Sequence, residues 1–212
     1  MAETHSRSEV LKASPPMFRT AWLDRLSRVH PAVPVVLFVP AIGILASFAF
    51  ARLATVTAVA LIALGYGFWT LAEYWIHRAI FHFEPVDGFG ARLHWIIHGV
   101  HHDHPNDPLR LVMPPSVSIP LSSLFCVGFW AVLGTPRWYA FAAGFVAGYL
   151  LYDMTHYYLH HHRPRTRAGR RLRELHMRHH FQDHTRGFGI SAPYWDRAFG
   201  TSSGRRGNRE AE

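Results

Sequence analysis

The stretch "WTLAEYWIHRAIFH", residues 69–82, joins the two features that decide the fold of this chain. Its first half closes an apolar run, residues 53–76, in which Glu73 is the one acidic residue. Its second half places His77 and His82 directly beyond that run. About 20 helical residues cross a hydrocarbon core of roughly 30 Å. The stretch therefore predicts a membrane-spanning helix that ends in histidines.

Three further apolar runs complete the same pattern. They extend over residues 32–51, residues 116–133 and residues 138 to about 152. A short connector around Arg52 joins the first two runs of the chain, and the turn "GTPR", residues 134–137, joins the last two. Short connectors make neighbouring helices antiparallel. We therefore predict an all-α integral membrane protein with four transmembrane helices in two hairpins.

Arginine positions predict the orientation, because Lys and Arg concentrate in the short loops on the cytoplasmic side. Lone arginines, Arg52 and Arg137, mark one side of the bundle. The opposite side carries Arg19, Arg25, Arg28, Arg78, Arg92, Arg163, Arg165, Arg167, Arg170 and Arg171. Both termini and all the histidine groups are therefore predicted to be cytoplasmic, with the histidines in a helical cap.

The two ends of the chain are polar. Residues 1–16, which end in Pro15-Pro16, and residues 202–212 are predicted to be disordered tails around one domain, residues 17–201. Within residues 18–29, apolar side chains recur at helical spacing, which predicts a short helix in the membrane interface or one docked on protein. The first apolar run begins too late for a cleaved signal peptide.

Composition narrows the chemistry of the chain. The single cysteine, Cys126, lies in an apolar run, so a disulfide framework and a cysteine-based metal site are excluded. The formal charge of +8 comes from arginines that flank apolar runs, which indicates a membrane and no nucleic-acid partner. A metal in this chain must be held by histidine.

The histidines form four groups. They are His77 and His82; His98, His101 and His102; His156 and His160; and His176, His179 and His180. On a helix, positions i, i+3 and i+4 share a face, so each HxxHH motif is expected to aim three imidazoles in one direction. Ten imidazoles exceed the four ligands of a closed zinc site, and two metals fit better. Imidazole suits iron, zinc, copper or nickel, so this step leaves the metal open.

Two acidic residues are candidates for orienting these histidines. Glu73 precedes His77 by four residues, and Asp153 precedes His156 by three. A metal-bound histidine usually donates its second N–H to a carboxylate or carbonyl. A cap or an ion pair with arginine is the alternative for each acid. His94 is expected in a supporting or packing role.

Five segments resemble the fatty acid hydroxylase superfamily, and within it the fatty acid 2-hydroxylase branch. They are "EYWIHRAIFHFEP", "HWIIHGVHHDHPNDPLRLVMPP", "GYLLYDMTHYYLHHHRP", "LRELHMRHHF" and "GFGISAPYWDRAFGT", from about residue 73 to 201. The resemblance implies a di-iron enzyme with a cytosolic cap above four transmembrane helices, in which the same ten histidines are the ligands. It also implies hydroxylation of a long acyl chain at C2, with O₂ and two electrons.

The resemblance further implies lipid and electron-transfer partners. No heme motif precedes the histidines, so a separate donor of the cytochrome b5 or ferredoxin/reductase type is expected. Zinc can replace iron in purified protein, since it lies above iron in affinity. The segment "PNDPLRLVMPP" is a candidate lid, and its Arg110 a candidate contact for the substrate headgroup, with a plain loop as the alternative. The acyl carrier stays open.

Other functions remain open beside this one. Sterol, carotenoid and alkane hydroxylases and desaturases use comparable histidine motifs. A different class is a non-catalytic metal-binding membrane protein, either a transporter or a structural zinc cap. Transporters place ligands near the bilayer midplane, whereas these histidines lie beyond the ends of the apolar runs, so the oxygenase is favoured.

Overall fold

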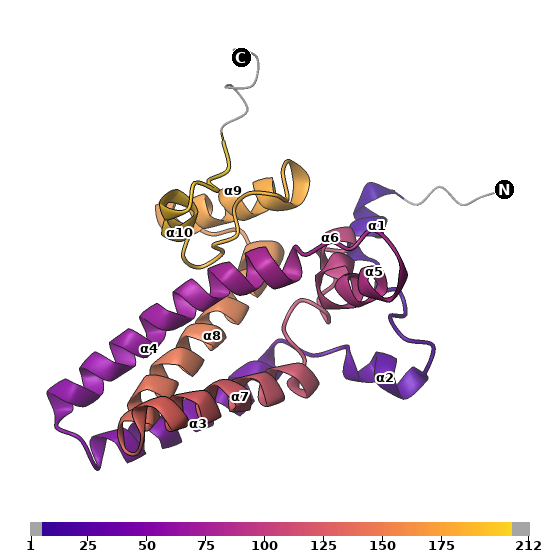
Figure 1. The fold of residues 1–212 in the computed structure, drawn as a ribbon. Helices are drawn as coiled ribbons and strands as arrows, with labels where there is room; N and C mark the ends of the chain where they lie inside the picture. The colour runs from indigo at the N-terminus through magenta and orange to yellow at the C-terminus, as the bar shows by residue number, and fades with distance from the viewer. Residues whose placement is uncertain (1–5, 205–212) are drawn as a thin grey trace.

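A computed structural model describes residues 6–204, and within this range it contains helices and no strand. Four long helices lie side by side at one end of the molecule (Figure 1). They are α3 (Ala32–Phe50), α4 (Thr55–Ile76), α7 (Pro115–Leu133) and α8 (Arg137–His161). The prediction of an all-α chain with four long helices is confirmed for the described residues.

Three helical segments are long and apolar enough to cross a membrane. They are α3, α7 and the segment Thr55–Phe81, which consists of α4 and the five residues that follow it. The predicted fourth span lies in α8, which is more polar than the other three. Helix α8 packs against α3, α4 and α7 and buries residues along most of its length. Its environment is therefore mainly protein, which relaxes the need for a continuous apolar surface.

Glycines allow α4 and α8 to approach closely. A Cβ atom on Gly65 of α4 would overlap the carbonyl oxygen of Phe141, and one on Gly144 of α8 would overlap that of Ile62. Small residues at such contacts let helix backbones pack directly in a membrane environment. The pair α4 and α8 thus forms the rigid axis that carries histidines at its far end.

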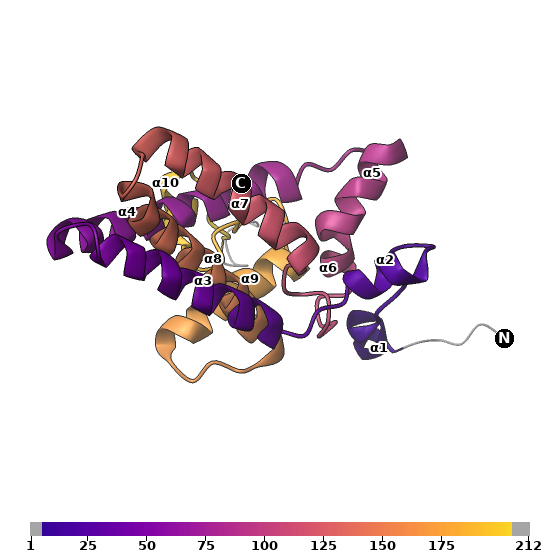
Figure 2. The same cartoon turned by 90° about the horizontal axis from the view of Figure 1, so that it is seen from below.

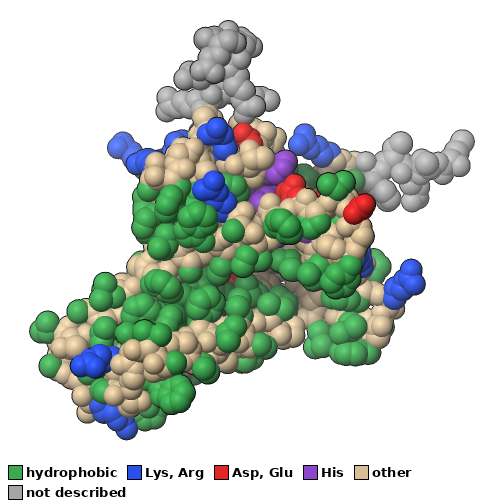
Figure 3. Space-filling view, in the orientation of Figure 1, with side chains coloured by type: hydrophobic (Ala, Val, Ile, Leu, Met, Phe, Trp, Pro, Cys, Tyr) green, Lys and Arg blue, Asp and Glu red, His purple; other side chains and the backbone are tan. Residues whose placement is uncertain are grey.

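The cap consists of shorter helices gathered at one end of the bundle (Figure 1), of which part projects past the long helices and part lies behind them when the molecule is seen from below (Figure 2). Its α-helices are α5 (Gly88–His94), α6 (Val100–Asp103), α9 (Arg167–Phe181) and α10 (Tyr194–Ala198). Two π-helical segments, η1 (His77–Phe81) and η2 (Trp95–Gly99), continue α4 and α5. Hydrophobic side chains cover the bundle, and histidines are visible within the cap (Figure 3). The histidine-rich helical cap is therefore present.

The N-terminal segment differs from the predicted disordered tail. Residues Arg7–Lys12 form helix α1, whose capping box joins Ser6 and Glu9. The carbonyl of Leu11 accepts a hydrogen bond from the Asn106 amide (3.0 Å). Tertiary contacts therefore order a polar sequence that has little apolar surface of its own. Residues 1–5 lie outside the described part, as do residues 205–212 of the predicted C-terminal tail.

Helix α2 (Ala21–Leu26) lies within the predicted interfacial segment and is shorter than expected. Trp22 is 62% exposed and Leu26 is 51% exposed. Asp24, on the same helix, pairs with Arg110 at 2.9 Å. The helix is thus docked on protein through its polar side and leaves apolar side chains at the surface.

Candidate metal centre

All ten predicted histidines converge in the cap as two groups of five. In each group, one potential ligand atom per histidine lies within 4.8 Å of all the others. Group A contains His77, His82, His98, His102 and His179. Group B contains His101, His156, His160, His176 and His180. Each group can hold one metal ion, so the geometry suits two metals.

Each HxxHH motif is divided between the groups, so the prediction that its three imidazoles point in one direction is wrong. His98 and His102 belong to group A, whereas His101 belongs to group B. In the second motif, His176 and His180 belong to group B, whereas His179 belongs to group A. At 3.6 residues per turn, side chains at i+3 and i+4 leave the helix about 100° apart. Each motif therefore reaches two neighbouring sites.

A π-helical turn brings His77 and His82 into one group. These residues are five apart, a spacing that an α-helix places on different faces, but the His82 amide bonds the His77 carbonyl at 3.1 Å. This i to i+5 bond widens the turn. π-Bulges often occur at functional sites, and here the bulge supplies two members of group A.

The imidazole nitrogens within each group face one another directly. In group A, the Nε2 atoms of His77 and His98 are 3.2 Å apart, and those of His82 and His179 are 3.0 Å apart. In group B, the Nε2 atoms of His160 and His176 are 2.7 Å apart. Such convergence of lone pairs is the arrangement that a shared cation stabilises.

The ten histidines of groups A and B are held in the neutral form. Burial, followed by neighbouring imidazoles, holds the pKa of His101 and of His180 well below the ordinary value. Burial also lowers the pKa of His102 to about 3 and that of His179 to about 4. Neutral imidazole is the form that binds metal. Both the donor set and its protonation state therefore fit a metal pair.

Backbone carbonyls orient two members of group A. The Nδ1 atom of His77 lies 2.7 Å from the Phe188 carbonyl oxygen, and that of His179 lies 2.8 Å from the Arg186 carbonyl oxygen. An Nδ1–H donor in this position leaves Nε2 free to bind metal. Both acceptors belong to the C-terminal segment of residues 186–201, whose role the sequence did not predict.

The buried carboxylate of Asp196 fixes this segment. It accepts hydrogen bonds from the Phe188 amide (2.9 Å), the Gly189 amide (2.9 Å) and the Thr201 hydroxyl (2.8 Å). Asp196 therefore fixes Phe188 through its amide, and the Phe188 carbonyl oxygen that orients His77 is fixed with it. The motif "GFGIS" followed by "WD" was the available signal, but only the fold shows what this aspartate holds.

The two acids predicted to orient histidines have other partners. Glu73 accepts hydrogen bonds from the amide (2.7 Å) and the hydroxyl of Ser191. Asp153 accepts a hydrogen bond from the Met113 amide (3.2 Å). The predicted contact of Glu73 with His77 is replaced by an indirect one, in which the acid anchors the segment whose carbonyl orients that histidine. Asp153 anchors the loop before α7.

The other histidines that the structure describes lie outside both groups. His94 Nε2 contacts the Phe81 carbonyl oxygen (2.8 Å), which agrees with the expected packing role. His104 contacts the Val10 carbonyl oxygen (2.6 Å) in the N-terminal segment. His184 lies 3.6 Å from Glu84. These three residues position chain segments around the centre.

A cavity of about 280 Å³ reaches the metal centre from the bundle side. Its wall includes His98, His101 and His156. The rest is mostly apolar and comes from the N-terminal segment, η2, the loop before α7 and the start of α7, including Met17, Phe18, Leu23, Leu26, Ile96, Ile97, Leu111, Val112 and Val117. An apolar chain can therefore lie with one end beside the histidines.

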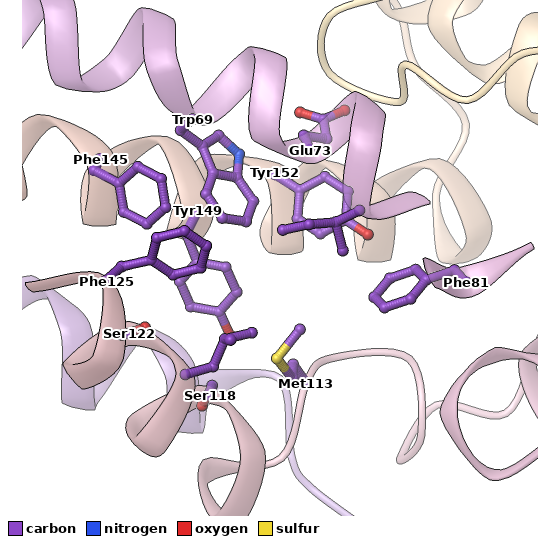
Figure 4. Close-up of a pocket in the computed structure, with 12 residues that line it drawn as sticks. Trp69, Glu73, Phe81, Met113, Ser118, Ser122, Phe125, Phe145, Tyr149 and Tyr152 are labelled. Carbon is purple, nitrogen blue, oxygen red and sulfur yellow. The ribbon is translucent and has the colours of Figure 1, made fainter. Parts of the chain in front are cut away.

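A smaller pocket of about 20 Å³ adjoins this cavity between α4, α7 and α8. Phe81, Met113 and Tyr152 line both spaces. Figure 4 shows Phe81 and Met113 toward one end of the small pocket, and Phe125 and Phe145 toward the other. The aromatic bundle core thus continues the apolar path away from the histidines.

Arg110 lies in the wall of the larger cavity, but other partners occupy its guanidinium. It pairs with Asp24 (2.9 Å), and it donates hydrogen bonds to the Ser27 hydroxyl (3.3 Å) and the Pro15 carbonyl. Only 3% of the side chain is exposed. These contacts support an anchoring role for Arg110 rather than the expected contact with a substrate headgroup.

Comparison with known proteins agrees with this geometry. The family model for fatty acid hydroxylase matches residues 62–201. The chain is 40% identical over 147 residues to the dihydroceramide fatty acyl 2-hydroxylase FAH1 of Arabidopsis thaliana, covering 68% of this chain and 60% of that protein. It is 34% identical to the ceramide very long chain fatty acid hydroxylase SCS7 of Saccharomyces cerevisiae, covering 91% of this chain and 50% of that protein.

A solved structure described as full-length scs7p, with only the hydroxylase domain visible, has the same fold. It superposes with a TM-score of 0.80 at 34% identity, covering 86% of this chain and 70% of that chain. The chain spans between half and two thirds of the length of the two curated relatives named above. On the family match and these identities, this chain belongs to the fatty acid hydroxylase family.

Proposed function

We propose that this protein is a membrane di-iron monooxygenase that hydroxylates a long fatty acyl chain at C2. The observation that carries the proposal is that members of both five-histidine groups, His98 of group A and His101 and His156 of group B, line one apolar cavity. The relatives named as fatty acyl 2-hydroxylases support the position of the hydroxyl group. The domain proposed for this activity is residues 17–201.

The ten histidines are the proposed ligands, with five nitrogens for each iron ion. When bound, the iron pair would supply the strongly oxidising chemistry that an unactivated C–H bond requires and that side chains cannot provide. Five donors exceed the four of a closed tetrahedral zinc site. Zinc still binds imidazole readily, so purified protein can carry zinc in place of iron.

The chain's own residues bind and orient the acyl group. Leu111, Val112 and Val117 line the cavity as an apolar wall, which favours a hydrocarbon over water. His98 and His156 line the same cavity, so the carbon that reacts is the one held beside them. C2 is placed there if the carboxyl end stays near the cap and the tail runs toward the aromatic core.

The proposed membrane arrangement has four spans, with α8 as the fourth, and places both termini and the histidines in the cytoplasm. Three apolar helices and the arginine-rich cap support it. The proposed reaction consumes two electrons, and a separate donor of the cytochrome b5 or ferredoxin/reductase type is the proposed partner that supplies them. Glu73 and Asp153 would support the centre through Ser191 and Met113.

The test is mass spectrometry of hydrolysed total lipids from cells that express the protein with a compatible electron donor. Wild-type protein should produce 2-hydroxy fatty acids, and the double variant His179→Ala, His180→Ala should produce none. His162→Ala, outside both groups, is the matched control and should retain the product. An alkene, or a hydroxyl at another carbon, would move the protein to another histidine-motif oxygenase. Folded, iron-loaded protein without product would favour a non-catalytic metal cap.

A further inference from the structure

An arginine-rich surface lies on the outer side of the metal centre. It consists of the exposed residues Arg163, Arg165, Arg167 and Arg170, in the loop after α8 and the first turn of α9. We call this surface the arginine patch. Arg171 and Arg178 extend the same side of α9, where both pair with Glu174. The patch is therefore a dense positive region in a chain whose net charge is +8.

Helix α9 connects this patch to the metal centre. Its inner side carries His176, His179 and His180, which belong to both groups. Its outer side carries the arginines, so the patch and the histidines are separated by about one helix diameter, roughly 10–12 Å. Arg173 donates a hydrogen bond to the Leu159 carbonyl (2.9 Å), which holds α9 against the last turns of α8.

The position of the patch favours an occupant in the aqueous phase over the bilayer. If α8 leaves the hydrocarbon core near Tyr152, its nine further residues up to His161 rise roughly 13 Å at 1.5 Å per residue. The lipid headgroup layer occupies about 5–7 Å of this height, which leaves the patch roughly one Debye length, about 8 Å at physiological ionic strength, from the lipid charges. The field of the patch therefore points into the aqueous phase, where it attracts a soluble or peripheral acidic partner.

The reaction proposed for this chain requires such a partner. One C–H bond breaks and one C–O bond forms: R–H + O₂ + 2 e⁻ + 2 H⁺ gives R–OH + H₂O. The two electrons come from two one-electron carriers, each of which is oxidised once per turnover. We propose that the arginine patch docks an acidic one-electron carrier protein and that electrons enter across α9. This inference rests on the proposed function.

The test measures electron delivery separately from hydroxylation. Full-length, iron-loaded protein in neutral detergent is mixed without oxygen with a reduced plant-type [2Fe–2S] ferredoxin, an acidic carrier, and ferredoxin oxidation is followed by absorbance. For the wild type, the second-order rate constant should fall steeply as salt increases. The triple variant Arg163→Gln, Arg165→Gln, Arg167→Gln should react about tenfold more slowly at low salt, with a shallower salt dependence.

Two controls separate docking from damage to the metal centre. The variant Arg19→Gln, Arg25→Gln, Arg197→Gln also loses three exposed arginines and should react within about twofold of the wild type. An uncharged quinol should reduce all three proteins at equal rates. Equal ferredoxin rates for the patch variant and the wild type would overturn the inference, as would equal slowing with the quinol. An iron-loaded chain that neither reductant reduces would overturn the proposed function as well.

Discussion

At the residue scale, two histidines cross from one half of the chain to the other. Group A takes His77, His82, His98 and His102 from the first half of the chain, and group B takes four histidines from the second. The fifth member of group A is His179, and the fifth member of group B is His101. Each crossing residue therefore completes a site built mainly by the opposite half.

Replacement of a crossing histidine should affect one site more than the other. His101→Ala removes one of five donors from group B and leaves group A complete. We expect the metal content of purified protein to fall from two ions toward one per chain, measured by inductively coupled plasma mass spectrometry. His162→Ala should retain the wild-type content. Two ions in the His101→Ala protein would contradict the assignment of this residue as a ligand.

Asp196 should control metal retention without being a ligand. Asp196→Asn weakens the hydrogen bonds that hold Phe188 and Gly189, and the carbonyl that orients His77 then loses its fixed position. Loss of such a supporting contact typically costs about 10–100-fold in metal affinity. Competition with a chelator should show this loss, mainly for one of the two ions. Unchanged chelator resistance would show that the segment holds its position without this carboxylate.

Asp24 should make the N-terminal segment sensitive to acid. Burial acts to raise its pKa, but the Met17 amide and the guanidinium groups of Arg28 and Arg110 more than offset this and leave the pKa below the ordinary value of 3.8. A lowered carboxyl pKa contributes stability above the unfolded-state pKa, and this contribution is lost as pH falls through the folded-state pKa.

Hydrogen–deuterium exchange of residues 21–27, corrected for the intrinsic pH dependence of exchange, should report this loss. Wild-type protection is expected to fall below about pH 4, near the ordinary carboxyl pKa. Asp24→Asn protein should be less protected at neutral pH, and its protection should not fall further as the pH is lowered through about 4. An equal loss of protection in both proteins as the pH falls would assign the acid sensitivity to another group.

At the element scale, the contact between α4 and α8 sets the position of the histidines at the ends of both helices. Glycine is required where the two backbones meet, because Gly65 and Gly144 have no space for a side chain. A Cβ atom added to Gly67, on the same helix as Gly65, would meet no neighbouring group within 4 Å, so this position faces open space. Gly65 and Gly67 therefore form a matched pair for substitution, because only Gly65 lies at the contact between the helices.

Gly65→Ala should force α4 and α8 apart, whereas Gly67→Ala should not. Overpacking of this kind typically costs about 1–3 kcal/mol. We expect a lower midpoint of thermal unfolding in detergent for Gly65→Ala, together with reduced metal content, because the two helices carry members of different groups. Equal midpoints for the two variants would show that the helices adjust at this contact without loss.

At the scale of the whole molecule, the apolar cavity connects the membrane-facing helices with the cap. Val117 lines it at the start of α7 and is 49% exposed. Val132, near the other end of the same helix, is 83% exposed and does not line the cavity. A bulky residue at the first position narrows the path to the histidines, and the same residue at the second position does not.

Val117→Trp should reduce hydroxylation of the longest acyl chains most strongly, with a several-fold fall in their 2-hydroxy products. Val132→Trp should leave the chain-length distribution unchanged. Mass spectrometry of hydrolysed lipids, with metal content measured in parallel, is the check. An unchanged distribution in the Val117→Trp protein would place the acyl chain outside this cavity.

Local sequence patterns were sufficient to predict the helical class, the long apolar helices and the ten histidines that converge. These features follow from local properties: apolar length, helical spacing and the position of histidines beyond each run. The same patterns did not predict the division of the HxxHH motifs, since a motif such as His98, His101 and His102 indicates which side chains are near each other and not which partner each one meets.

Long-range packing sets which half of the chain completes each site and which groups support it. His179 joins group A because the packing of the cap places its Nε2 atom 3.0 Å from that of His82, and the carbonyl that orients His77 lies 111 residues later in the chain. Glu73 and Asp153 are near their histidines in sequence, yet they bond Ser191 and Met113. A buried polar group must find a partner among the segments that pack around it, and helical spacing does not specify those segments.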